Sequence, residues 1–182
     1  MEFRQFSIPG PVAIEPVRHG DARGYFSEIF RADRFVAAIG PVELVQENQS
    51  LSATPGTIRG LHFQVPPAAQ GKLVRCVAGA IFDVAVDMRH DSPGFGKWIA
   101  AELSADNGHQ LWVPAGFAQD GAAALAMGGR AGGQRGLDLE QSAARAFAES
   151  ALRQFDRLVG NERVAQRRPG AAVSIPAISS AT

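Results

Sequence analysis

Two side chains that could move and stabilise a proton lie close together in the chain, at His62 and Lys72. Imidazole titrates near neutral pH, so a histidine can act as a general base, and an ammonium group can stabilise the anion that proton removal creates. Asp83 places a carboxylate inside an apolar run, where a buried charge needs a partner or a raised pKa. The catalytic hypothesis is therefore His62, Lys72 and Asp83, and the alternative is a structural histidine and aspartate with a solvated lysine.

The segments that must position these groups have the pattern of β-strands. Residues 57–64 are partly β-branched or aromatic and end at Pro66-Pro67, so they predict a strand with alternating faces that carries His62. Proline lacks an amide hydrogen, so this strand must end there and a second must begin near Lys72. Residues 80–88 are the most strongly strand-like run in the chain, and they carry the aspartate.

Short strand-like runs recur along the rest of the first two thirds of the chain. They cover residues 3–8, 12–17, 25–30, 42–50, 97–103 and 110–113, with turn residues expected at 19–24. Apolar residues at helical spacing predict one short helix at 32–39, which ends at Gly40-Pro41. The strand series is expected to close at residues 114–116. Many short strands with one short helix favour an all-β sandwich or barrel.

The composition narrows the class of protein. A chain of 182 residues suits one domain with a sizeable core. The 18 basic residues balance 18 acidic ones with no basic stripe, which argues against nucleic acid as a partner. The single cysteine, Cys76, excludes an intrachain disulfide and is typical of a reducing compartment. No leader segment or membrane span is predicted, so we expect a cytoplasmic protein.

The composition changes at Gln119. Tyrosine, tryptophan, histidine and lysine do not occur after Ala118, residues 128–136 have the pattern of a flexible linker, and apolar residues recurring every four positions predict a helix at 140–159. We therefore expect a domain over residues 1–118 and a separate segment over 119–182, made of an Ala/Gly-rich linker, a helix and a disordered tail. The abrupt change favours a reading-frame shift near codon 119 over a diverged C-terminal third.

Several unusual blocks occur in an order that resembles the dTDP-4-dehydrorhamnose 3,5-epimerase family, over roughly residues 1–118. They are DARGYFSE at 21–28, QEN at 46–48, RGLHFQ at 59–64, QGKLVR at 70–75, FDVAVD at 82–87, SPGFGKW at 92–98 and WVPAGFA at 112–118. The resemblance implies a cupin-type jelly roll, incomplete here because the match ends near residue 118. It also implies a homodimer and an enzyme that uses neither a metal nor an organic cofactor.

The resemblance further implies a reaction and the residues that serve it. The substrate would be dTDP-4-dehydro-6-deoxyglucose, whose keto group acidifies the hydrogens on both flanking carbons, and the product dTDP-4-dehydro-L-rhamnose. His62 would remove a proton and Lys72 would stabilise the enolate oxygen. The nucleotide and diphosphate would be held by six residues, part of them from the partner subunit. These are Arg23, Phe26, Glu28, Gln46, Asn48 and Arg59.

The chain also departs from the family pattern. The family has a histidine where Gln119 stands, and further along it supplies a tyrosine that donates a proton on the opposite sugar face, whereas the only tyrosine here is Tyr25. The open alternatives are an epimerase with impaired or single-carbon activity and a catalytically inactive nucleotide-sugar-binding cupin. A metal-dependent cupin is disfavoured, because its site needs two or three histidines on neighbouring strands and only His62 lies on one.

Overall fold

The computed structural model describes residues 1–54 and 56–123 of the 182-residue chain. Its described residues form one helix and nine strands. These are β1 Glu2–Gln5, β2 Val12–Glu15, β3 Arg18–Asp21, β4 Gly24–Ser27, α1 Ala32–Ile39, β5 Lys72–Arg75, β6 Ala80–Asp87, β7 Trp98–Ser104, β8 Gln110–Val113 and β9 Phe117–Ala123. The helix predicted at 140–159, the linker and the tail lie outside the described residues. None of the helices described has the length and hydropathy that a membrane span requires.

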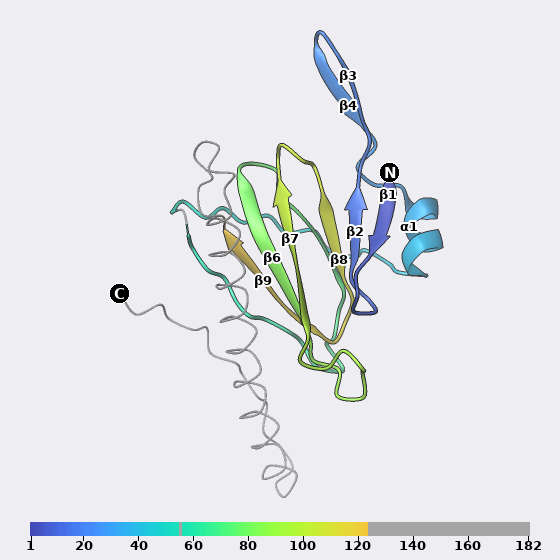
Figure 1. Cartoon of the computed structure of the whole chain (residues 1–182), viewed down its shortest axis with the longest axis vertical. Coiled ribbons are helices and arrows are strands. Elements are labelled where there is room, and N and C mark those ends of the chain that lie inside the picture. The colour runs from blue at the N-terminus through green and yellow to red at the C-terminus, as the bar shows by residue number, and fades with distance from the viewer. Residues whose placement is uncertain (55, 124–182) are drawn as a thin grey trace, which may run out of the picture.

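Two antiparallel sheets make up the body of the molecule (Figure 1). One has the strand order β1-β2-β8-β5 and the other the order β7-β6-β9. Apolar side chains from both sheets pack between them, among them Ala85 of β6, Ile99 of β7 and Val113 of β8. Burial of this shared face is the main favourable term that holds the two sheets together. The all-β architecture predicted from the sequence is confirmed.

The helix predicted at 32–39 is also confirmed, with both ends where the sequence placed them. Its one fully buried side chain, Phe35, packs edge-on against Trp112 of β8 with 5.4 Å between ring centroids. The amphipathic stripe therefore covers the outer face of the four-stranded sheet. Gly40 has φ 107°, which favours glycine, and its amide donates to the carbonyl of Val36 to end the helix.

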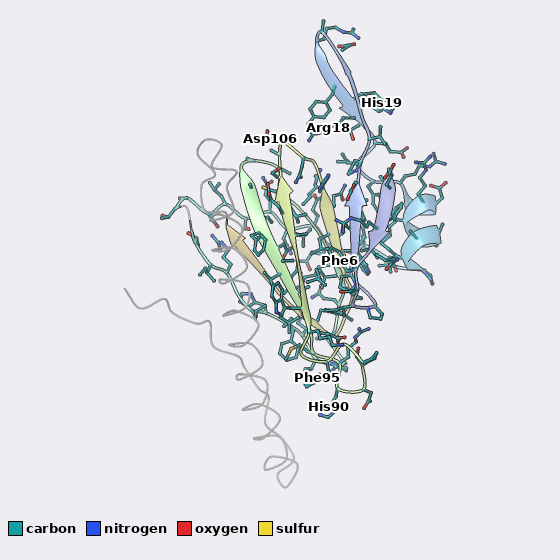
Figure 2. All side chains as sticks on the ribbon, in the orientation of Figure 1. Phe6, Arg18, His19, His90, Phe95 and Asp106 are labelled. Carbon is teal, nitrogen blue, oxygen red and sulfur yellow. The ribbon has the colours of Figure 1, made fainter. Side chains whose placement is uncertain are left out.

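A hairpin of β3 and β4 projects beyond the body (Figure 1). Arg18 fixes its base: Nη2 donates to the carbonyl of Ala105 at 2.6 Å and Nη1 donates to the carbonyl of Asp106. The same guanidinium lies over the ring of Tyr25, 4.3 Å from its centroid. Figure 2 shows Arg18 beside Asp106 at this junction. The turn expected at 19–24 is therefore shorter than predicted, because residues as far as Asp21 pair within the hairpin.

Two predicted strands are absent, at 42–50 and 57–64, and both predictions are wrong. The backbone there is irregular apart from one antiparallel bridge between His62 and Gln119. Side-chain alternation alone does not make a strand, because each strand needs a neighbour to satisfy its amides and an apolar layer to cover its buried face. No apolar layer covers Val45 of the first segment or Ile58 of the second, which are 82% and 52% exposed.

One strand is present that the sequence did not predict. β9 continues the series past residue 116 and pairs with β6 from Ile81↔Ala123 to Asp87↔Phe117. It runs across the boundary expected after residue 118, and the division of the chain into a domain and a separate C-terminal segment stays a prediction. The composition change at Gln119 hid this strand, because Gly121 and two alanines carry no local strand signal.

A buried carboxylate fastens one end of the two sheets. Asp87, at the end of β6, accepts hydrogen bonds from the backbone amide, Nε and Nη2 of Arg89 and from Ser92 Oγ. Arg89 in turn donates to the carbonyl of Pro9 and lies over the ring of Phe117, 4.6 Å from its centroid. The loop that follows, marked by His90 and Phe95 in Figure 2, is thereby tied to the start of β9.

Candidate functional site

Lys72 points into the space between the two sheets. It is the first residue of β5 and lies directly opposite Val113 of β8. Facing residues of an antiparallel pair project their side chains to the same side, and Val113 belongs to the core between the sheets. The lysine is half-buried, so part of its side chain packs inside the body.

Asp83 reaches the same interior from the opposite sheet. It lies in the middle of β6, two residues from Ala85, so the two side chains share a face, and Ala85 is a core residue. The side chain of Asp83 is fully buried, and its Oδ2 accepts a hydrogen bond from Nε2 of Gln119 at 2.8 Å. The sequence prediction of a buried carboxylate in this strand is confirmed.

Backbone hydrogen bonds to Gln119 place His62 near Lys72 and Asp83. Its amide donates to the carbonyl of Gln119 and its carbonyl accepts from the amide of Gln119, both at 2.9 Å. The imidazole therefore lies on the same side as the Gln119 side chain, which faces the interior opposite Ala85. Leu61 and Phe63 pack on the other side, against the outer face of the three-stranded sheet. The histidine is exposed, so the site runs from a solvent-accessible imidazole to a buried carboxylate.

Burial and charge oppose each other at Lys72. Burial lowers the pKa of the ammonium, and the attraction of the Asp83 carboxylate acts in the opposite direction, with burial the stronger effect. A partly desolvated ammonium interacts more strongly with a nearby anion than one in water does. The aspartate thus favours a charged lysine at a position where burial alone would favour a neutral one.

This arrangement can support proton exchange next to a carbonyl group. An exposed imidazole can take a proton, and an ammonium group on the same interior side can stabilise the resulting enolate oxygen. Among the described residues there is no cluster of three or more histidine, cysteine or acidic side chains placed to hold a metal ion.

The six substrate-binding candidates fall into three places. Arg23, Phe26 and Glu28 belong to the projecting hairpin and its exit: Arg23 pairs with Asp21, Phe26 is 73% exposed, and Glu28 lies 3.9 Å from both Arg31 and Arg34. Gln46 and Asn48 form one hydrogen bond at 3.0 Å in an exposed segment. Arg59 donates to the hydroxyl of Ser52 and the carbonyl of Leu51. The structure gathers His62, Lys72 and Asp83 on one interior side, and it places the hairpin candidates away from them.

Gln119 is the residue of this site to which sequence reasoning assigned no role. In the sequence it is only a departure from the family pattern, whereas in the structure it contacts both His62 and Asp83. A polar residue directly after the apolar pair Phe117-Ala118 was the signal available, since both of those residues are core. The signal was too weak to interpret without knowing that this strand pairs with β6.

Comparison with known proteins matches the part of the chain that carries the sequence blocks between residues 21 and 118. The family model described as dTDP-4-dehydrorhamnose 3,5-epimerase matches residues 5–126. A dTDP-4-dehydrorhamnose 3,5-epimerase from Sinorhizobium fredii is 61% identical over 118 residues, covering 65% of this chain and 60% of the relative. One from Shigella flexneri is 56% identical over 119 residues, covering 65% of each. The chain thus spans less than two thirds of the length of these two relatives.

A solved structure agrees with these matches. The crystal structure of a dTDP-6-deoxy-D-glucose-3,5-epimerase from Legionella pneumophila, in complex with dTDP-4-keto-L-rhamnose, is 43% identical and superposes with a TM-score of 0.64, over 69% of this chain and 66% of that one. The two packed antiparallel sheets are accordingly the cupin-type jelly roll that the resemblance implied. Because the family model covers well over half of the 182 residues, the chain belongs to the dTDP-4-dehydrorhamnose 3,5-epimerase family.

Proposed function

We propose that this protein is a carbohydrate epimerase that converts dTDP-4-dehydro-6-deoxyglucose to dTDP-4-dehydro-L-rhamnose. The observation that carries the proposal is the shared interior side of His62, Lys72 and Asp83, which lie on three separate segments: the residue bridged to Gln119, β5 and β6. The family membership and the relative solved with dTDP-4-keto-L-rhamnose support the choice of substrate.

The reaction begins when the imidazole of His62 takes a proton from a carbon next to the keto group. The electron pair of that C–H bond moves to the carbonyl oxygen, and the ammonium of Lys72 stabilises the enolate. The electron pair then returns from the enolate oxygen to the carbon as a proton from solvent water arrives on the opposite face, which inverts that carbon. The same exchange at the second carbon flanking the keto group completes the product. Loss of a positioned base typically costs roughly a hundred- to ten-thousandfold in rate, and loss of one oxyanion donor costs on the order of 3 kcal/mol.

The nucleotide is held, in this proposal, by Arg23, Phe26, Glu28, Gln46, Asn48 and Arg59, within a homodimer. The projecting hairpin supports this, because it presents Tyr25 and Phe26 to solvent at 61% and 73% exposure, beyond the body that carries His62 (Figure 1). Large exposed aromatics on one element mark an interaction surface. Seated on a second copy, the hairpin would add its arginine and aromatic ring to the site of that copy. The single thiol, Cys76, supports a cytoplasmic location.

Deuterium incorporation from solvent into the dTDP-sugar tests the reaction without requiring a finished product. The unaltered chain should exchange hydrogen at a carbon flanking the keto group, and His62→Gln and Lys72→Met should each slow the exchange by roughly a hundredfold or more. His90→Gln and Lys97→Met are matched controls, because both residues are exposed and lie in the loop between β6 and β7. Equal exchange in the unaltered chain and in His62→Gln would refute the role of the base.

The second candidate is a catalytically inactive nucleotide-sugar-binding cupin. It is favoured by one observation: the only tyrosine, Tyr25, lies on the hairpin and not beside the catalytic group. This candidate predicts that dTDP raises the melting temperature while solvent deuterium does not enter the sugar. The two measurements together separate a working epimerase, a binding protein and a chain that recognises neither ligand.

A further inference from the structure

One buried amide side chain is not accounted for by the proposed proton transfer. Gln119 is 6% exposed, and its Nε2 donates to the carboxylate of Asp83 at 2.8 Å. Burial of a primary amide is costly unless its polar atoms are hydrogen-bonded, so the bond to Asp83 also holds the Gln119 side chain in place. The bond is also specific, since it crosses from one strand to the next along a diagonal of the β6–β9 ladder.

Gln119 also connects the groups of the site. Its backbone amide and carbonyl both pair with those of His62, and its side chain holds the carboxylate that attracts Lys72. A single residue therefore touches the base through the main chain and reaches the lysine through Asp83. The titratable groups facing Gln119 from the elements around it are His62 of the bridged segment, Asp83 of β6 and Lys72 of β5.

We propose that Gln119 is a positioning residue that directs the Asp83 carboxylate toward Lys72 and fixes both relative to His62. A hydrogen bond to a carboxylate favours its ionised form, so the amide keeps a negative charge beside the ammonium group. The amide itself does not titrate, so this support does not vary with pH. The role in catalysis rests on the proposed function, whereas the effect on Lys72 is a property of the folded chain and can be measured without substrate.

The chain is well suited to that measurement because it contains only two lysines, Lys72 and Lys97. Reductive methylation with ¹³C-formaldehyde labels both amines and the N-terminus, and the NMR signals report the pKa of each labelled amine. Gln119→Met keeps the approximate shape and removes the donor, so we expect the titration midpoint of Lys72 to move to lower pH. Gln119→Glu adds a second carboxylate, so we expect that midpoint to move to higher pH.

Two internal controls accompany these variants. Lys97 is exposed on the loop before β7, and its midpoint should not move. Gln110→Met removes another buried amide, which donates to the carbonyl of Ile29 on the far face of β8, and should lower stability without moving Lys72. Opposite shifts of Lys72 in the two Gln119 variants support the proposal. An unchanged Lys72 midpoint in both, or an equal shift in Gln110→Met, overturns it.

Activity and amide exchange supply independent readouts. If the chain exchanges deuterium into the dTDP-sugar, Gln119→Met should reduce the rate at saturating substrate by about tenfold, with little change in the substrate concentration at half-saturation. If neither variant folds, the side-chain amide of Gln119 in the unaltered protein decides: its protons should exchange slowly with solvent, and rapid exchange overturns the proposal. Lack of any activity would refute the proposed function but leave the Lys72 test intact.

Discussion

Removal of the Asp87 carboxylate should be among the most damaging single changes outside the candidate site. Asp87 is fully buried at the end of β6, the strand that also carries Asp83, and accepts hydrogen bonds from three nitrogens of Arg89 and from Ser92. The perturbation is Asp87→Ala, which deletes the two carboxylate oxygens that accept these hydrogen bonds. Its consequence should reach the site, because the same cluster holds the start of β9, where Gln119 lies.

The expected loss of unfolding free energy depends on the contacts that Arg89 retains in Asp87→Ala. Truncation of one partner in a buried ion pair typically costs about 3–5 kcal/mol. The side chain of Arg89 is 36% exposed and retains its bond to the Pro9 carbonyl and its contact with Phe117, so water and these groups compensate it in part. We therefore expect about 3 kcal/mol of lost unfolding free energy, which for a chain of this size lowers the melting temperature by roughly 6–12 °C.

The pH dependence of this loss has a definite sign. Burial alone would raise the pKa of Asp87, but the hydrogen bonds from Arg89 and Ser92 outweigh it and hold the pKa below the ordinary value of 3.8. A carboxyl with a depressed pKa stabilises the folded state above its unfolded-state pKa, and this stabilisation is lost as the pH falls through the folded-state value. The difference between the unaltered chain and Asp87→Ala should thus be constant near neutral pH and shrink below about pH 4.

Urea unfolding at pH 7 and at a series of acidic pH values measures both quantities. Asp91→Ala is the matched control, because Asp91 is an exposed aspartate of the same loop and its removal should change the unfolding free energy by less than about 0.5 kcal/mol. The reasoning fails if Asp87→Ala lies within about 1 kcal/mol of Asp91→Ala at pH 7. It also fails if the difference between Asp87→Ala and the unaltered chain widens as the pH is lowered.

Three further predictions concern the hairpin, the turn before β5 and the lysine. Arg18→Gln removes the guanidinium that bonds the Ala105 and Asp106 carbonyls, so amide exchange measured by mass spectrometry should accelerate across residues 18–27 while β6 stays protected; equal acceleration in both would contradict this. Gly71→Ala would place a Cβ atom 2.4 Å from the ring of Trp112, so the unfolding free energy should fall by about 1–3 kcal/mol and the urea midpoint should fall with it; an unchanged midpoint would contradict the packing. Asp83→Asn removes the charge that opposes the effect of burial on Lys72, so the pKa of the lysine should fall further and the alkaline limb of deuterium exchange should move to lower pH; an unmoved limb would show that the two groups do not interact.

The sequence by itself determined the elements whose signals are local. The helix at Ala32–Ile39 follows from apolar spacing and a terminating Gly40, and β6 follows from a dense run of β-branched and apolar residues. Lys72 and Asp83 could be placed on strands for the same reason. The family blocks pointed to the same residues, because those blocks are short contiguous stretches that need no knowledge of the fold to recognise.

The tertiary structure decided which strands exist and which side chains meet. The run that includes Gln119 is a strand because β6 supplies hydrogen-bond partners along its length, and the alternating run at 42–50 is not a strand because no neighbour among the described residues supplies them. The common interior side of His62, Lys72 and Asp83 depends on the register of three separate pairings, β5 with β8, β6 with β9, and the bridge at His62. A shift of one residue in any of them would turn a side chain to the opposite face, and no local pattern in the sequence fixes a register between distant segments.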